Sequence, residues 1–567
     1  MKYLRLGDLL VQAGTITEDE LMQALALQKG SGERLGTVLI QSGIITEREL
    51  IQALEVQLGV EFIDLSKTTL SPEIARLLPK GIAQRNSVVP VRVEKDELYL
   101  AMSDPLNFMA VEEVKDATHK RVVPMIATQE AVDRAIITLY GNEGAARAIA
   151  QMKREGAGGN AVRESEGPTA IGGENDENTA PTIRLVNSLI ERAVTERASD
   201  IHLEPREAEM VVRIRVDGVL RNMFTVPRDL QGAVLSRFKV MGGMNTAERK
   251  VPQDGRANVR VKESDIDLRI STLPTVYGEK MVVRLLDKSS QILTRTGIGL
   301  DEASSERYNR LMRATSGVIL IAGPTGSGKS STMSTMLREL NTPSVNVVTL
   351  EDPVEYNIDG INQCQINEKT GMTFSGGLRS ILRQDPDIIG VGEIRDGETA
   401  EIAMRAAITG HLVLSTIHTS DTIATLDRLY DIGVAPYLTA SALKGVVAQR
   451  LVRRICPHCR KEYVPSDDEL TLLGLERTPD MKLYHGSGCP MCFHTGYRGR
   501  IGVFEVLLVD GAMRRMIVER APREDMLHAQ RQTGFISLAD QCRRLVLEGT
   551  TSAEEATRTI FSTIDDM

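Results

Sequence analysis

Residues 323–330 read Gly-Pro-Thr-Gly-Ser-Gly-Lys-Ser and lie between an apolar run at 317–322 and a helical stretch at 331–340. The run predicts a buried strand that leads into the loop, and the helix follows directly. Glycines let backbone N–H groups turn inward around phosphate oxygens, and the helix N-terminus adds its dipole. Lys329 can then reach the β- and γ-phosphates, and the Ser330 hydroxyl can bind Mg²⁺. The predicted nucleotide-binding residues are Gly323, Pro324, Thr325, Gly326, Ser327, Gly328, Lys329, Ser330 and Ser331.

The size and charge of the chain limit its class. Its 567 residues exceed what one hydrophobic core holds, so we expect three or four domains. A net charge of −9 does not favour nonspecific nucleic-acid binding. No apolar run approaches the roughly 18 residues of a membrane span, and the first residues lack the apolar core of a signal peptide. These features predict a cytosolic, multidomain protein.

Two acidic segments downstream of the loop follow apolar strands. Residues 387–393, Asp-Ile-Ile-Gly-Val-Gly-Glu, predict a strand that ends in a carboxylate beside the phosphate-binding loop. Glu393 there can polarise the attacking water, although an ordinary acid at a strand end also fits. Residues 349–355, Thr-Leu-Glu-Asp-Pro-Val-Glu, follow a strand at 345–350 and, taken alone, also fit a loop with surface acids.

Two histidines flank a third apolar strand. His411 precedes the predicted strand at 412–417, and His418 follows it. Either histidine by itself fits a structural role. A lone histidine would favour that role. The domain from about residue 297 alternates predicted strands and helices, as a parallel sheet requires.

Together these motifs resemble the secretion ATPase superfamily, which includes the type II secretion ATPases and the type IV pilus assembly and retraction ATPases. The resemblance covers nearly the whole chain beyond about residue 180. It implies that residues 349–355 are the family's Asp box, that Glu393 is its Walker B glutamate, and that residues 407–419 are its His box. The catalytic residues implied are Glu393, Lys329, Glu351, Asp352, Glu355 and His418.

The region before the loop matches the family's N-terminal half at residues 198–204 and 251–256. Arg269 and Arg284 lie on predicted strands, where the resemblance implies arginines that bind nucleotide phosphates. The guanidinium fork suits phosphate oxygens because it donates directed hydrogen bonds. A solvated strand face is the alternative. Further candidates for nucleotide or subunit contacts are Arg379 and Arg383.

Four of the six cysteines form two Cys-x-x-Cys pairs, Cys456 with Cys459 and Cys489 with Cys492. Four thiolates at this spacing suit tetrahedral Zn²⁺ with no open coordination position, which predicts a structural site. A redox pair is the alternative, but it would not need two copies. The retraction ATPases generally lack this segment, so it resembles the assembly and secretion branch.

The N-terminus contains a repeat with a period of 29 residues, 5–28 and 34–57. Each copy begins Arg-Leu-Gly, ends in Gln and contains a capping box that predicts a helix, at Thr17–Glu20 and Thr46–Glu49. Both copies resemble the tandem motif with which some family members bind cyclic di-GMP. A helical docking module whose leucines are core is the alternative. The ligand-binding residues implied are Arg5, Leu6, Gly7, Leu10, Gln28, Arg34, Leu35, Gly36, Leu39 and Gln57.

The motifs divide the chain into parts. We expect an N-terminal regulatory or docking domain at 1–140 and a flexible linker at 141–181, where the chain becomes Gly-, Glu- and Asn-rich. The motor would comprise an N-terminal domain at 182–290 and an ATPase domain at 291–567, with the cysteine segment at 456–502. The resemblance implies a multidomain α/β fold, a RecA-like P-loop ATPase domain preceded by a PAS-like α/β domain and an N-terminal helical or α+β module.

The resemblance also implies a function. We expect a Mg²⁺-dependent ATPase, a homohexameric motor that adds pilin subunits at the inner face of the cytoplasmic membrane. Its ligands would be ATP, Mg²⁺, a structural Zn²⁺ and regulatory cyclic di-GMP. Its partners would be an inner-membrane platform protein and a cytoplasmic docking protein, with no nucleic acid. The alternatives are a type II secretion ATPase, a nucleotide-switched binding module with little turnover, and a nucleic-acid translocase, which the net charge disfavours.

Overall fold

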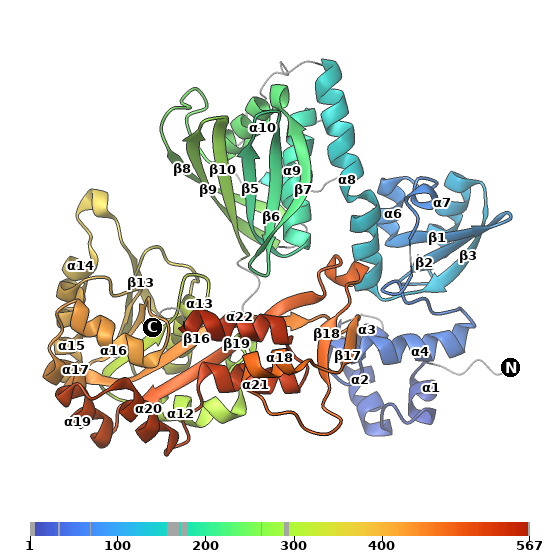
Figure 1. The fold of residues 1–567 in the computed structure, drawn as a ribbon. Coiled ribbons are helices and arrows are strands. Elements are labelled where there is room, and N and C mark those ends of the chain that lie inside the picture. Colours follow the sequence, from blue (N-terminus) through green and yellow to red (C-terminus); the bar gives the residue numbers. More distant parts are fainter. Residues whose placement is uncertain are drawn as a thin grey trace. The chain divides into compact units, whose positions relative to one another are not determined.

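The computed structural model divides into two compact units, which are described separately (Figure 1). The first unit is Met1–Asp287 with Gly488–His494, and the second is Lys288–Ser487 with Thr495–Met567. Both units mix helices and strands, as the predicted multidomain α/β fold requires. The described residues are 6–31, 35–68, 70–155, 169–171, 180–261, 264–287 and 294–564.

The N-terminal repeat forms two similar helix pairs that pack across each other, α1 against α4 and α2 against α3. The predicted capping boxes are present in both copies. The Glu20 carboxylate accepts the Thr17 N–H at 2.8 Å, and that of Glu49 accepts the Thr46 N–H at 2.7 Å. Leu10 and Leu39, at equivalent positions, are buried in the shared core. The helices are α1 (Leu6–Gln12), α2 (Glu18–Ser31), α3 (Leu35–Gln41) and α4 (Glu47–Leu58).

A small α/β subdomain follows the repeat. Its sheet has the order β1-β2-β3, with β1 and β2 antiparallel and β2 and β3 parallel. Tyr140 is fully buried on helix α8 (Gln129–Glu155), and its hydroxyl donates to the Ala75 carbonyl at 2.8 Å, which holds this helix against the subdomain. The elements are α5 (Pro72–Ala75), α6 (Lys80–Asn86), β1 (Val88–Glu94), β2 (Glu97–Met102), α7 (Phe108–Thr118) and β3 (Arg121–Ile126).

The prediction of a linker from residue 141 is wrong for residues 141–155, because helix α8 (Gln129–Glu155) continues through them. Ala145, Ala148 and Met152 recur at helical spacing and are buried in the core of the next subdomain. This apolar stripe is short and lies among polar residues, so the composition of the segment did not indicate a helix. Residues 169–171 form strand β4, and the rest of the predicted linker before residue 180 lies outside the described residues.

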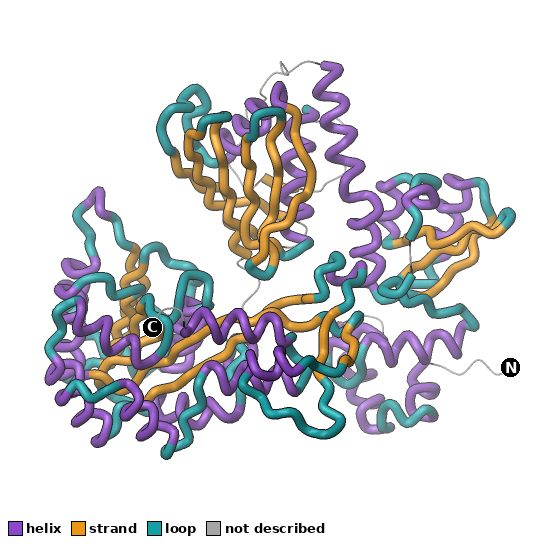
Figure 2. The backbone as a smooth tube through the Cα atoms, viewed as in Figure 1, coloured by secondary structure: helices purple, strands orange, loops and turns teal. Residues whose placement is uncertain are grey.

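The second subdomain of this unit is a seven-stranded sheet with the order β4-β8-β9-β10-β5-β6-β7. Helices α9 and α10 contribute apolar side chains to its core. Figure 2 shows helices next to the strands of this sheet. A buried ion pair, Lys239 Nζ to Glu279 Oε1 at 2.6 Å, joins α10 to β10. The elements are α9 (Pro181–Thr195), β5 (Ala198–Pro205), β6 (Glu209–Val216), β7 (Val219–Pro227), α10 (Arg228–Met241), β8 (Gln253–Val261), β9 (Ser264–Thr275) and β10 (Gly278–Asp287).

The second unit is built on a seven-stranded sheet with the order β13-β12-β14-β15-β11-β16-β19. Every neighbouring pair is parallel except β16 and β19, which confirms the predicted parallel sheet. Residues of β11 alternate between the two cores on opposite faces of the sheet, so this central strand is buried on both sides. The strands are β11 (Gly317–Ala322), β12 (Val347–Glu351), β13 (Asn362–Gln365), β14 (Ile388–Val391), β15 (Leu412–Ile417), β16 (Leu443–Ile455) and β19 (Tyr497–Leu508).

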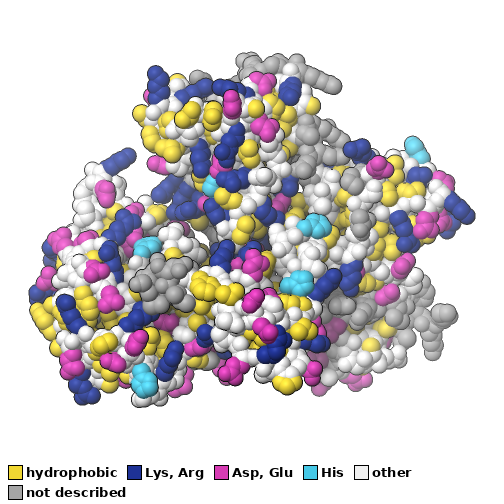
Figure 3. Space-filling model, viewed as in Figure 1, with side chains coloured by type: hydrophobic (Ala, Val, Ile, Leu, Met, Phe, Trp, Pro, Cys, Tyr) yellow, Lys and Arg dark blue, Asp and Glu magenta, His cyan; other side chains and the backbone are white. Residues whose placement is uncertain are grey.

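Helices cover both faces of this sheet, and a two-stranded ribbon, β17 with β18, accompanies the cysteine segment. None of the described helices is long and apolar enough to cross a membrane. Figure 3 shows basic and acidic side chains interspersed on the visible face of each unit. The remaining elements are α11 (Arg295–Ile298), α12 (Glu302–Met312), α13 (Lys329–Leu340), α14 (Phe374–Ile381), α15 (Gly397–Ile408), α16 (Thr422–Asp431), α17 (Pro436–Ala442), β17 (Arg460–Tyr463), α18 (Asp467–Leu473), β18 (Leu483–Gly486), α19 (Gly511–Glu519), α20 (Arg523–Arg531), α21 (Leu538–Leu547), α22 (Ala553–Ile564) and the 3-10 turns Glu368–Thr370 and Pro490–Cys492.

Candidate functional site

The phosphate-binding loop connects β11 to α13, as predicted, and its glycines are sterically required. Gly323, Gly326 and Gly328 have φ of 153°, 80° and 91°, which side-chain-bearing residues rarely adopt. A Cβ on Gly323 would lie 2.6 Å from the Gln449 carbonyl oxygen, and one on Gly328 would lie 2.8 Å from Gln449 Nε2. The loop therefore lies directly on strand β16.

Lys329 is buried at the start of α13 and lies across the loop. Its Nζ donates to the carbonyls of Gly323 at 2.7 Å and Pro324 at 3.0 Å. Burial, helped by the Arg450 charge and opposed by that of Glu393, lowers the pKa of Lys329 to about 8. An anionic phosphate at the loop would favour the ammonium form, because opposite charges stabilise each other in a poorly solvated site.

Glu393 and His418 meet at the edge of the sheet. Glu393 follows β14 and His418 follows β15, and these strands are parallel neighbours. His418 Nε2 lies 3.4 Å from Glu393 Oε2, and Arg395 forms an ion pair with the other carboxylate oxygen. Burial lowers the pKa of His418, and the Lys329 charge lowers it further, so the imidazole is neutral near pH 7. A mostly buried carboxylate thus lies beside a neutral histidine and a buried lysine.

The two histidines of the predicted His box have different surroundings. His411 Nδ1 lies 2.9 Å from the Ala406 carbonyl oxygen at the end of α15, which is a helix-terminal contact. His418 contacts Glu393 instead. The structural alternative therefore fits His411, and the geometry supports an active-site role for His418.

The Asp-box acids lie at the end of the next strand, β12. Glu351 is buried, and its Oε1 accepts the Thr349 hydroxyl at 2.6 Å and the Gln363 amide at 3.0 Å, which ties β12 to β13. Asp352 is exposed, and its charge helps to raise the pKa of Arg395 after the larger contribution of Glu393. The structure thus places Asp352 near the Glu393 cluster and gives Glu351 a scaffolding contact. Glu355 is half-buried in the same loop.

In the first unit, three arginines line up across neighbouring strands. Arg284 pairs in register with Arg269, and Arg269 pairs with Arg256. Arg284 is about half exposed and contacts Asp200 at 3.1 Å, whereas Arg269 is mostly buried. Arg256 is exposed and was not predicted as a site residue, because its place in the row depends on strand pairing.

The two further arginine candidates lie on or just after helix α14. Arg379 forms an ion pair with Glu398 at 2.6 Å, and Arg383 donates to the Arg379 carbonyl at 2.9 Å. Both are exposed, and their contacts are local.

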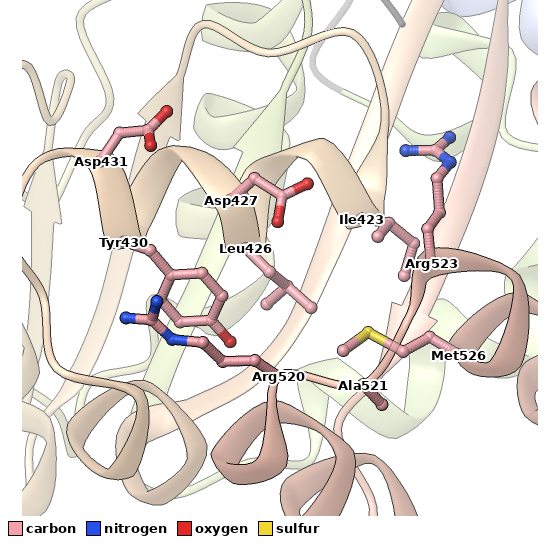
Figure 4. Close-up of a pocket in the computed structure, with 9 residues that line it drawn as sticks. All are labelled: Ile423, Leu426, Asp427, Tyr430, Asp431, Arg520, Ala521, Arg523 and Met526. Atoms are coloured by element: carbon pink, nitrogen blue, oxygen red, sulfur yellow. The ribbon is translucent and has the colours of Figure 1, made fainter.

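A pocket lies between α16 and the segment around α20, and its lining includes none of the predicted site residues (Figure 4). The Arg520 guanidinium lies 4.9 Å from the Tyr430 ring centre, and Arg523 pairs with Asp421 at 2.8 Å. Sequence reasoning missed it because its apolar residues have the spacing of an ordinary core helix. It is lined by Ile423, Leu426, Asp427, Tyr430, Asp431, Arg520, Ala521, Arg523 and Met526.

The four predicted cysteine ligands come together. The sulfur atoms of Cys456, Cys459, Cys489 and Cys492 all lie within 4.8 Å of one another, and all four residues are buried. The Sγ atoms of Cys489 and Cys492 are 3.8 Å apart, which matches the edge of a tetrahedron with metal–sulfur bonds of about 2.3 Å. Cys542 lies outside this cluster, and burial raises the pKa of its thiol to about 12. The cluster has the donor set and spacing to hold a zinc ion.

The structure describes only some of the residues that were predicted to bind cyclic di-GMP in the N-terminal repeat. Arg5 and Arg34 lie outside the described residues. A Cβ on Gly7 would lie 2.6 Å from Leu21, and one on Gly36 would lie 2.9 Å from Leu50, so each glycine lets the following helix pack closely. Their ligand contacts, and those of the other implied residues, stay predictions. Leu6, Leu35, Gln28 and Gln57 are half-buried, and Leu10 and Leu39 are core residues.

Comparisons with known proteins cover both halves of the chain. The family described as "Type II/IV secretion system protein" matches residues 175–558, and the "MshEN domain" matches residues 58–146. The type IV pilus assembly ATPase PilB of Thermus thermophilus is 42% identical over 558 residues, which are 97% of this chain and 58% of that protein. This chain therefore spans little more than half of that relative.

Two further relatives are covered almost in full. The type II secretion system protein E of Pseudomonas aeruginosa is 41% identical over 486 residues, 85% of this chain and 96% of that protein. The type IV pilus assembly ATPase PilB of Myxococcus xanthus is 38% identical over 556 residues, 97% of this chain and 98% of that protein. The similarity thus extends to proteins of both systems.

We predict that ADP affinity depends on the protonation of Lys329. Because its pKa is about 8 and bound phosphate raises it, binding takes up a proton at higher pH. Affinity should be nearly constant below about pH 7.5 and fall as pH rises through about 8. Calorimetric titration at a series of pH values measures this. A Lys329→Met variant should bind more weakly and lose the fall, and an unchanged fall in the variant would contradict the assignment.

Proposed function

The chain belongs to the type II/IV secretion system protein family, and from this premise we propose that it is an ATP-hydrolysing motor that drives type IV pilus assembly. The observation that carries the ATPase assignment is the Glu393–His418 pair, which lies at the same sheet edge as the phosphate-binding loop. PilB-named relatives from two organisms support the pilus assignment, one of them over nearly its full length.

These groups have different roles in the proposed reaction. Backbone N–H groups of residues 323–328 and the Lys329 ammonium bind the β- and γ-phosphates and offset the charge that develops on them. Glu393 accepts a hydrogen bond from the attacking water and orients it toward the γ-phosphorus. His418 fixes the carboxylate from one side, and Arg395 pairs with its other oxygen.

A divalent cation fits this arrangement. The Ser330 hydroxyl is exposed at the first turn of α13, as a Mg²⁺ ligand requires, and Asp352 is an exposed carboxylate at the same sheet edge. When bound, Mg²⁺ neutralises charge on the β- and γ-phosphate oxygens. Dependence of turnover on Mg²⁺ is part of the proposal.

The motor would work as a homohexamer at the inner face of the cytoplasmic membrane. The row of Arg256, Arg269 and Arg284 supplies guanidinium groups for nucleotide phosphates, and Arg379 and Arg383 are exposed enough to reach a neighbouring subunit. Nucleotide-driven domain movement would act on an inner-membrane platform protein, with a cytoplasmic docking protein as a further partner. Subunit stoichiometry and partners rest on the family resemblance.

A type II secretion ATPase is the second candidate. The relative from Pseudomonas aeruginosa is nearly as similar as the first PilB relative, and it is covered over 96% of its length. That match spans 85% of this chain, whereas both PilB matches span 97%. The wider coverage favours the pilus system.

We predict that Glu393→Gln lowers kcat for ATP by at least about 100-fold, because an amide cannot act as the carboxylate does toward water. The dissociation constant for ATP should change by less than about threefold, since the loop is intact. Phosphate release and equilibrium binding measure the two quantities. Glu401→Gln, on the exposed surface of α15, is the matched control and should keep wild-type turnover. Full turnover in Glu393→Gln would favour the nucleotide-switched binding module.

Cyclic di-GMP is the proposed regulator of the N-terminal domain. The two repeat copies form equivalent helix pairs, which suits a ligand with two equivalent halves. Arginine can pair with phosphate or stack on guanine, and a repeated Arg-Leu-Gly start is not needed for a simple core. The match to the MshEN domain begins at residue 58, directly after both copies, and covers the neighbouring subdomain.

Saturable binding of cyclic di-GMP to the full chain is therefore expected. The Arg5→Ala/Arg34→Ala variant should lose it, because both phosphate- or guanine-facing groups are removed. Calorimetric titration measures binding, and an unchanged ATP affinity shows that the variant is folded. If the folded wild type does not bind cyclic di-GMP, the repeat is a docking module. The type II secretion and pilus assignments would then be equally supported.

Zinc is the proposed occupant of the four-cysteine cluster. Because all four sulfur atoms are buried and close together, a single ion would saturate its coordination here and serve structure. Zinc content by mass spectrometry should be about one ion per chain. Cys459→Ser should lower the zinc content and the thermal stability, whereas Cys542→Ser should keep the zinc. Wild-type protein that is folded and free of zinc after preparation without chelators would contradict the assignment.

A further inference from the structure

We propose that Gln449, on strand β16, is a positioning residue of the phosphate-binding loop, an inference that rests on the proposed ATPase function. The Gln449 side chain and backbone carbonyl lie against the loop. The side chain also contacts helix α13, which begins at Lys329. Through these contacts Gln449 sets the geometry in which bound ATP reacts, while leaving most of the binding affinity to the loop itself.

One end of the Gln449 carboxamide holds helix α13. Its Oε1 accepts the Thr332 hydroxyl at 2.6 Å. Gln449 is 1% exposed and Thr332 is 0% exposed, so water does not compete for this hydrogen bond. Thr332 lies one turn after Lys329, and the bond therefore fixes the first turn of the helix against the sheet.

The other end of the carboxamide faces the loop. A Cβ on Gly328 would come within 2.8 Å of Gln449 Nε2, and one on Gly323 within 2.6 Å of the Gln449 carbonyl oxygen. The carbonyl and side chain of Gln449 therefore occupy the space that side chains at 323 and 328 would need.

Strand β16 also reaches the loop that carries His418. Arg450, the next residue, donates from Nη2 to the Ser420 carbonyl at 2.6 Å. Successive side chains of a strand point to opposite faces, so Gln449 and Arg450 hold elements on both sides of β16. A shift at Gln449 would thus change the relation between the phosphate-binding loop and the Glu393–His418 pair. Such misplacement affects the reaction more than ground-state binding.

Four full-length variants separate positioning from simple packing. Gln449→Met keeps the size and burial but removes both polar atoms, and Thr332→Val removes the hydroxyl donor. Thr332→Ser restores the hydroxyl and is the conservative rescue. The matched control is Thr335→Val: this threonine is equally buried on the same helix, but its hydroxyl donates to the Ser331 carbonyl and does not reach Gln449.

The expected result is a split between kcat and KM. Gln449→Met and Thr332→Val should lower kcat for ATP by about tenfold or more, with KM changed by less than about threefold. The Gln449→Met/Thr332→Val double variant should lose no more kcat than the more affected single variant, because both substitutions remove the same interaction. Thr332→Ser and Thr335→Val should stay near wild type. Wild-type kcat in Gln449→Met, or an equal loss in Thr335→Val, would overturn the inference.

Hydrogen exchange gives a readout that does not need turnover. Backbone amides of residues 323–337 should exchange several-fold faster in Gln449→Met and Thr332→Val than in wild type or Thr332→Ser. If the wild type hydrolyses no ATP, the proposed function fails, and the exchange rates still decide whether Gln449 holds the loop. Equal exchange at these amides in all variants would overturn the inference in either case.

Discussion

The site depends on one constraint, the parallel order of the sheet around β11. Parallel strands end at the same edge, so residues that follow β11, β12, β14 and β15 converge although up to 95 residues separate Gly323 from His418. Strand β11, which leads into the phosphate-binding loop, is buried on both faces. Packing on both sides holds the strand in place and thereby fixes the start of the loop. Without that order, Glu393 and His418 would be isolated polar residues at strand ends.

Burial adjusts the chemistry of the groups that converge. The pKa values of Lys329 and His418 are both lowered, because each is partly removed from water and each lies near other cations. Lys329 is thereby made sensitive to an anionic ligand, and His418 stays neutral beside Glu393. The same close packing requires glycine at 323 and 328, where strand β16 leaves no room for a side chain. The sensitivity of Lys329 to a bound anion and the geometry of the loop therefore both depend on the packing around the loop.

Away from the nucleotide site, local patterns predicted structure well where they were self-contained. The capping boxes at Thr17 and Thr46 form as expected, because all their partners lie within three residues. The four cysteines meet because two short pairs needed only one long-range contact. The linker prediction failed at 141–155, since the helical stripe there is stabilised by the core of another subdomain and not by its own composition.

The sequence by itself determined the phosphate-binding loop, the strands around it, the metal-ligand spacing and the residue types that carry the chemistry, because each is a short-range pattern. Only the tertiary structure decided which histidine joins Glu393, that Arg256 extends the arginine row, and that Gln449 lies under the loop. Thr332 and Gln449 are 117 residues apart. Such a contact depends on strand order and packing, and no local spacing records it.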